Sequence, residues 1–86
     1  MKVRNMTSNN GNEIPNQFII ESEDGIFFQS YRSIIAKKQA GKITLDPVYW
    51  DYSTTTGKYR NLFLGEKKKD TERKIKDGTY TLANLN

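Results

Sequence analysis

Hydrophobic and polar residues alternate through the first half of the chain as they do in β-strands. Residues 18–22 are rich in β-branched and aromatic side chains, and residues 26–31 have the same character. Asp24 and Gly25 lie between the two runs, and Asp-Gly in this position is a strong signal for a tight hairpin turn. The pattern therefore predicts an antiparallel hairpin over residues 18–31.

The same pattern predicts further strands after this hairpin. Residues 33–37 continue the β-rich stretch, and residues 42–45 alternate polar and apolar side chains. Gly41 favours a turn between them, and Pro47 ends the last strand because proline cannot donate a ladder hydrogen bond. Residues 32–40 also contain good helix formers, so a helix is the alternative there. We favour the strand because Gly41 sits at a natural hairpin position.

Helical signals begin after a dense aromatic segment, residues 48–52. Asp51 or Ser53 can cap a helix by accepting a hydrogen bond from a backbone N–H of its first turn. Apolar side chains then recur at helical spacing as far as residue 64. Gly65 follows and is a good helix terminator. The sequence thus predicts a helix over residues 54–64.

A second short helix and a final strand complete the expected order. Asp70 can cap a helix over residues 71–76, and residues 79–82 alternate as a strand in which Tyr80 and Leu82 face inward. The predicted fold class is α+β: a small antiparallel sheet of four to five strands, with two short helices inserted before the last strand.

The first residues of the chain are predicted to be disordered. Residues 1–15 are polar, include a cluster of turn formers over residues 8–12, and end at Pro15. We therefore expect a disordered N-terminal arm over residues 1–15 and a single α+β domain over residues 16–86.

Composition argues against most kinds of catalysis. Among the 86 residues there is no Cys and no His, which removes the usual thiolate nucleophile, the usual general base and the common zinc ligands. Gly57-Lys58 lacks the first glycine and the hydroxyl residue of a phosphate-binding loop. We expect a protein that is not an enzyme and has no metal and no cofactor.

The charge of the chain favours an acidic partner. Lys and Arg number 14 against 10 Asp and Glu, a formal net charge of +4, and the basic residues gather in two stretches with aromatic residues near them. Such a pattern fits phosphate contacts with stacking, or a solvated surface beside an ordinary aromatic core. The candidate binding residues are Tyr31, Arg32, Lys37, Lys38, Tyr49, Trp50, Lys58, Tyr59, Arg60, Lys67, Lys68 and Lys69.

The aromatic segment and the helix after it carry a resemblance to a known group of proteins. The string is Tyr49-Trp50-Asp51-Tyr52-Ser53-x-Thr55-Thr56-x-Lys58-Tyr59-x-x-x-Phe63-Leu64-Gly65, with Phe28-x-Ser30-Tyr31 before it and Ile75-Lys76-x-Gly78 and Leu85-Asn86 after it. It is similar to a family of small, uncharacterised proteins of tailed bacteriophages, over residues 26–86. The resemblance implies an accessory protein in the bacterial cytoplasm, and it brings no catalytic residues.

Two functional hypotheses follow. The first is a non-catalytic accessory protein that binds and inhibits a host enzyme or a defence complex, such as a CRISPR nuclease complex. The alternative is a small basic protein that binds DNA or RNA directly through Lys, Arg and aromatic contacts. The expected partners are thus a host protein or nucleoprotein complex, or nucleic acid itself. No membrane is expected, because no stretch approaches the ~20 apolar residues of a membrane span.

Overall fold

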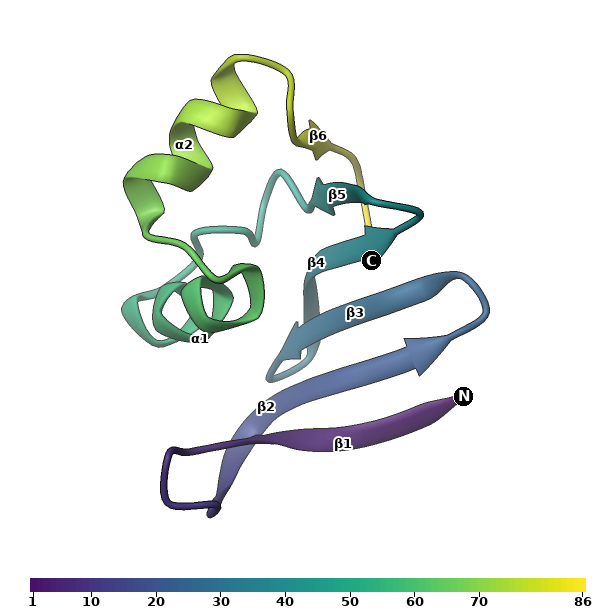
Figure 1. The fold of residues 1–86 in the computed structure, drawn as a ribbon, viewed down its shortest axis with the longest axis vertical. Helices are drawn as coiled ribbons and strands as arrows, with labels where there is room; N and C mark the ends of the chain where they lie inside the picture. Colours follow the sequence, from purple (N-terminus) through teal and green to yellow (C-terminus); the bar gives the residue numbers. More distant parts are fainter.

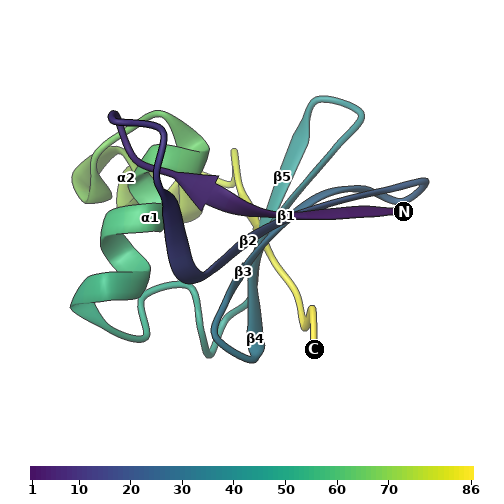
Figure 2. The same cartoon turned by 90° about the horizontal axis from the view of Figure 1, so that it is seen from below.

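Two helices pack on one face of a six-stranded sheet (Figures 1 and 2). The computed structural model describes residues 1–86. Its elements are β1 (Lys2–Thr7), β2 (Glu13–Ser22), β3 (Gly25–Ser30), β4 (Ser33–Gln39), β5 (Lys42–Leu45), α1 (Thr54–Leu64), α2 (Lys68–Lys76) and β6 (Thr81–Leu82). The strands lie in chain order across the sheet, and only β5 and β6 are parallel. The predicted α+β fold class is confirmed.

The expected N-terminal arm is instead the edge of the sheet, so the prediction of disorder over residues 1–15 is wrong. β1 pairs antiparallel with β2, and β2 already begins at Glu13. The cluster of turn formers closes this hairpin, since the N–H of Ser8 donates to the carbonyl of Asn12 at 2.8 Å. Met6 packs against the core from β1. Pairing with β2 therefore orders a segment whose own composition is polar.

The central hairpin forms where the sequence predicts it. β2 and β3 pair in register up to Ser22 opposite Gly25. Gly25 has a φ of 128° and lies against the backbone carbonyl of Lys38, where a Cβ atom would collide with that oxygen. Only glycine fits such a position. β4 is a strand, as predicted, and not a helix.

The core lies between the sheet and the helices. Phe28 is fully buried in β3 and meets Phe63 of α1 with 5.8 Å between the ring centroids. Lys38 lies on the same side, with its Nζ 4.3 Å from the centroid of the Phe63 ring. The buried hydrophobic residues are Ile19, Phe28, Ile35, Ala36, Leu45, Phe63 and Tyr80.

The helix ends agree with the sequence for α1 and differ for α2. Ser53 caps α1 by accepting a hydrogen bond from the N–H of Thr56 at 3.1 Å, and Gly65 ends it with a φ of 69°. α2 begins at Lys68 rather than at residue 71, and Asp70 lies in its first turn instead of capping it. A carboxylate there is favourable because the first turn of a helix attracts negative charge.

The chain after α2 returns to the sheet through Tyr80. Its ring is buried, as predicted, and its hydroxyl donates to Oε1 of Glu66 at 2.7 Å. Burial alone would raise the pKa of Glu66, but hydrogen bonds from Lys74, Thr71 and Tyr80 outweigh it and lower that pKa.

Leu82 is 43% exposed, so its predicted inward orientation is wrong. Leu82 lies in β6, a two-residue strand at the edge of the sheet. The helix α1 contacts β3 and β4 in the middle of the sheet and so lies away from this edge.

Asp46 fixes the end of β5 and the last residues of the chain. Its side chain is buried, with Oδ1 accepting from the N–H groups of Val48 and Tyr49 at 2.9 and 3.1 Å. Oδ2 accepts from the N–H of Leu85 and from Nδ2 of Asn86 at 2.9 and 3.0 Å. Burial would raise the pKa of Asp46, but these four hydrogen bonds outweigh it and lower the pKa below 3.8.

We expect Asp46→Asn to destabilise the protein by about 2–4 kcal/mol at pH 7, because an amide supplies one acceptor oxygen where four donors converge. A carboxyl group whose pKa is lower in the folded state stabilises the fold at pH values above its unfolded-state pKa. This stabilisation is lost as pH falls through its folded-state pKa. The difference in the free energy of unfolding between Asp46→Asn and wild type should therefore become smaller below about pH 4.

Urea unfolding of both proteins across pH values measures this gap. Glu23→Gln, at an exposed hairpin position, is the matched control and should leave the unfolding free energy at pH 7 almost unchanged. A variant at Asp46 within about 0.5 kcal/mol of wild type would contradict the prediction.

Candidate binding site

Arg60 organises the aromatic segment that joins β5 to α1. Its side chain is 1% exposed, although the residue was expected on a basic surface. Nη1 donates to the carbonyl of Trp50 at 2.7 Å and to Oδ1 of Asp51 at 3.2 Å, and Nη2 donates to Oδ1 of Asn61 at 3.0 Å. The guanidinium carbon lies 5.1 Å from the centroid of the Trp50 ring. Arg60 thus holds this segment to α1 through charge-assisted hydrogen bonds and a cation–π contact.

Asp51 connects Arg60 to the second helix. Its other oxygen pairs with Nζ of Lys68 at 2.7 Å. Burial would raise the pKa of Asp51, but hydrogen bonds from Lys68 and Arg60 outweigh it and lower that pKa. The same hydrogen bond raises the pKa of Lys68. Asp51 is therefore a bridge between two cations and not the helix cap, which is Ser53.

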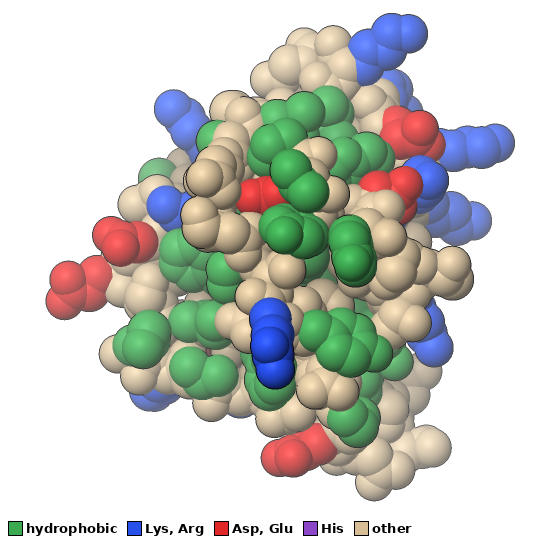
Figure 3. Space-filling view, turned by 180° about the vertical axis from the view of Figure 1, so that it is seen from behind, with side chains coloured by type: hydrophobic (Ala, Val, Ile, Leu, Met, Phe, Trp, Pro, Cys, Tyr) green, Lys and Arg blue, Asp and Glu red, His purple; other side chains and the backbone are tan.

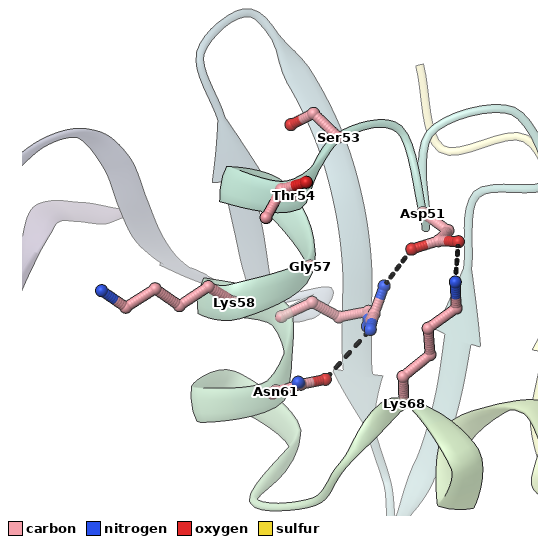
Figure 4. A pocket seen from close by; sticks show the side chains of 8 residues that line it. Asp51, Ser53, Thr54, Gly57, Lys58, Asn61 and Lys68 are labelled. Carbon is pink, nitrogen blue, oxygen red and sulfur yellow. Dashed lines mark hydrogen bonds and ion pairs between the residues drawn. The ribbon is translucent and has the colours of Figure 1, made fainter.

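A shallow polar pocket opens beside this bridge (Figure 4). It has a volume of about 580 Å³ and no hydrophobic lining residue. Lys58 is exposed and extends away from the Asp51–Lys68 pair, and its Nζ lies 5.4 Å from the centroid of the Tyr59 ring. Its lining residues are Asp51, Ser53, Thr54, Gly57, Lys58, Arg60, Asn61 and Lys68. We call it the polar pocket.

A second pocket of about 670 Å³ lies on the other side of Ser53, which lines both. Aromatic rings from three parts of the chain meet there, and Tyr49 and Tyr52 pack with 5.5 Å between their ring centroids. Arg32 is its one charged residue. The lining residues are Asn16, Phe18, Gln29, Ser30, Tyr31, Arg32, Ser33, Ile35, Tyr49, Tyr52, Ser53 and Thr56. We call it the aromatic pocket.

The face of the sheet away from the helices carries a row of side chains that stand directly opposite one another. Ile19, Phe28 and Ala36 are in register and face the core, so the residues next to them on the strands face outward. The register gives an outer row across β1, β2, β3 and β4. The outer row is Val3, Ile20, Phe27 and Lys37.

A family model matches residues 1–78 of the chain. The protein belongs to the Family of unknown function (DUF8033). The chain matches no curated protein and no solved structure. The family assignment includes the N-terminal strand and stops before β6. The resemblance to tailed-phage proteins stays a prediction.

The structure brings some of the sequence-predicted binding residues together and separates others. Tyr31, Arg32 and Tyr49 line the aromatic pocket, while Lys58, Arg60 and Lys68 line the polar pocket. The remaining six lie elsewhere: Lys37 on the outer row, Lys38 at Phe63, Trp50 and Tyr59 packed against the core, and Lys67 and Lys69 at the start of α2.

Two of the predicted contact residues instead support the fold. Arg60 is buried, and Nζ of Lys38 donates to the carbonyl of Phe63 at the end of α1. Lys68 and Lys69, which precede the predicted helix over residues 71–76, belong to α2 in the structure. Lys68 also forms an ion pair with Asp51, so it is less available to a binding partner than Lys69.

Sequence reasoning missed residues that complete the pockets and the outer row. Phe18 and Tyr52 line the aromatic pocket, and Val3 begins the outer row. Tyr52 belongs to the aromatic string, and its 69% exposure distinguishes it from Tyr49 and Trp50, which are half-buried. Phe18 and Val3 carry no local signal, because their positions depend on strand register. Neither helix has the length and the apolar run that crossing a membrane requires.

We expect Arg60→Lys to lower the free energy of unfolding by about 2–3 kcal/mol. A lysine keeps the charge but cannot reach Trp50, Asp51 and Asn61 at once with one ammonium group. Urea unfolding followed by circular dichroism measures the loss. Arg73→Lys is the matched control, since the Arg73 side chain is 65% exposed and surface pairs contribute little. Equal losses in the two variants would count against a central role for Arg60.

Proposed function

We propose that this protein is a non-catalytic binding protein that docks a protein partner on the outer face of its sheet. The observation that carries the proposal is the outer row. Val3 is 58% exposed, Ile20 and Phe27 are half-buried, and none of the three belongs to the core cluster. Apolar side chains aligned on an uncovered face are typical of interaction surfaces.

The charge of this face indicates the chemistry of the partner. Nζ of Lys37 lies 5.4 Å from the centroid of the Phe27 ring and gives the row its one charge. The next row of the same face is Asn5, Phe18, Gln29 and Ile34, and it is uncharged. The view from behind shows exposed hydrophobic side chains over much of the surface, with basic and acidic side chains between them (Figure 3). A partner with an apolar patch and a nearby carboxylate fits this surface.

The finer form of the proposal follows the resemblance to tailed-phage proteins. The protein would then act in the bacterial cytoplasm by occupying a surface of a host enzyme or of a defence complex, such as a CRISPR nuclease complex. Inhibition of this kind needs a surface and no catalytic group. The small size of the chain and its aromatic string support this form.

Val3→Lys should weaken partner binding, because it places a second cation in an apolar contact. The wild type, Val3→Lys and Val48→Lys are used as baits in nuclease-treated bacterial lysate. Val48 is 69% exposed and lies outside the sheet, so its variant makes the same chemical change at a matched site. The captured protein is then purified, and its affinity for each bait and its activity with each bait are measured.

We expect wild type and Val48→Lys to bind this protein alike and to inhibit it, and Val3→Lys to bind at least about tenfold more weakly. Circular dichroism shows whether each bait is folded. Equal binding by both variants would place the contact elsewhere, and loss of every partner after nuclease treatment would favour nucleic acid as the ligand.

The second candidate function is direct binding of nucleic acid, which the basic surface around α2 favours. Lys67 and Lys69 are exposed at the start of the helix, and neither has an ion-pair partner. Lys58 adds an exposed cation on α1, with its Nζ over the ring of Tyr59. Cations free to contact phosphates supply most of the sequence-independent affinity of such proteins.

Reversing Lys67 and Lys69 to Glu tests this candidate without breaking the Asp51–Lys68 pair. The change removes two positive charges and adds two negative ones, which takes the formal net charge from +4 to 0. A nucleic-acid binder should lose affinity for all sequences alike and show a shallower salt dependence. Electrophoretic mobility shifts at several salt concentrations measure both. Unchanged affinity would exclude the start of α2 as the phosphate-contacting surface.

A further inference from the structure

We propose that the aromatic pocket binds a nucleotide, with the base stacked on exposed tyrosine rings and the phosphate held by Arg32. The nucleotide is either a free monophosphate or one unit of a single strand, because both present the same base and phosphate. None of the four residues of the outer row lines this pocket, although Phe18 and Gln29 of the neighbouring row do.

The lining of the pocket has the chemistry that a nucleotide requires. Tyr31 and Tyr52 are 51% and 69% exposed, so their rings are open to a ligand. Every base has a flat π-face that stacks on aromatic rings. Arg32 is the only charged lining residue, and no carboxylate opposes an anion there. The volume of about 670 Å³ falls within the usual range of small-molecule sites, about 300–1,000 Å³.

The position of Tyr31 gives a second, independent observation. It lies in the two-residue turn between β3 and β4 with a φ of 57°, a region that favours Gly or Asn over aromatic residues. Its N–H donates to the carbonyl of Asn16 at 2.7 Å, and Asn16 has a φ of 65°. Backbone strain of this kind is often found at binding sites. An exposed tyrosine at this position is not explained by packing.

Polar groups around the rings can read the edge of a base. Nε2 of Gln29 donates to the carbonyl of Tyr31 at 2.7 Å, which fixes that amide beside the ring. The hydroxyls of Ser30 and Thr56 lie 3.1 Å apart, and both residues line the pocket. Gln17 stands opposite Ser30 in register, and both polar atoms of its buried amide lack a partner. Gln29, Ser30 and Thr56 thus supply polar groups to the lining, while Gln17 is buried and does not line the pocket.

The lining disfavours the other common ligand of tyrosine pockets, an organic cation. Arg32 would repel it, and the pocket has no carboxylate to compensate. An acidic peptide could satisfy Arg32, but it would leave the exposed rings of Tyr31 and Tyr52 without a flat partner. Nucleotide chemistry uses both features of the pocket together.

Two variants separate the base contact from the phosphate contact. Tyr31→Asn should fold at least as stably as wild type, because Asn tolerates a positive φ. It should weaken binding about fivefold or more, the low end of the loss seen when a stacking ring is removed. Arg32→Gln should weaken binding of thymidine monophosphate and leave thymidine almost unaffected. Lys42→Gln, at an exposed lysine at the start of β5, is the matched charge control and should bind like wild type.

NMR titration of the isotope-labelled protein with thymidine, thymidine monophosphate and a short oligo(dT) strand measures these affinities and maps the contact. We expect shifts centred on Tyr31, Arg32, Tyr49 and Tyr52. Tighter binding of oligo(dT) identifies a strand as the source, and equal binding identifies the free nucleotide. The proposal would be overturned if neither millimolar nucleotide nor oligo(dT) shifted the signals of the pocket, or if the shifts were confined to α2. Full affinity in Tyr31→Asn would also overturn it, as would binding of an acidic peptide in place of all three probes.

Discussion

The buried charge of Arg60 is the constraint on which the rest of the helical layer depends. A guanidinium that is removed from water needs partners for its donors. Nη1 and Nη2 of Arg60 find them in the segment between β5 and α1 and in α1 itself, while Nε has none. Asp51 then has an oxygen left for Lys68, which draws α2 to the same place. One desolvated cation therefore fixes how the aromatic segment and both helices are arranged, and with them the walls of both pockets.

Sequence reasoning found the parts of the fold that local signals decide. Asp24-Gly25 defines its hairpin, and Ser53 and Gly65 mark the ends of α1, because each acts through hydrogen bonds and φ angles within a few residues. β1 could not be predicted because its formation depends on another strand and not on local signals. Residues 2–7 are polar and become a strand only by pairing with β2, and an edge strand with solvent beside it needs few apolar side chains.

The site was predictable in composition and not in arrangement. Aromatic and basic residues are the distinctive side chains of the sequence, and Tyr31 and Arg32 lie together in one pocket. A lysine or arginine in a sequence is by default a surface charge, so nothing local indicated that Arg60 is buried. Phe18 reaches the same pocket as Tyr52 through strand pairing and helix packing, which no spacing along the chain encodes.

The two edges of the sheet have a consequence for how other chains can approach. β1 carries Lys2 and Arg4, and β6 has only two residues. Charged and very short edge strands resist the addition of a further strand. Polymerisation through backbone pairing is thereby discouraged, although six strands with free edges would otherwise invite it. Contact with another chain is thereby left to side chains rather than to the backbone at the sheet edges.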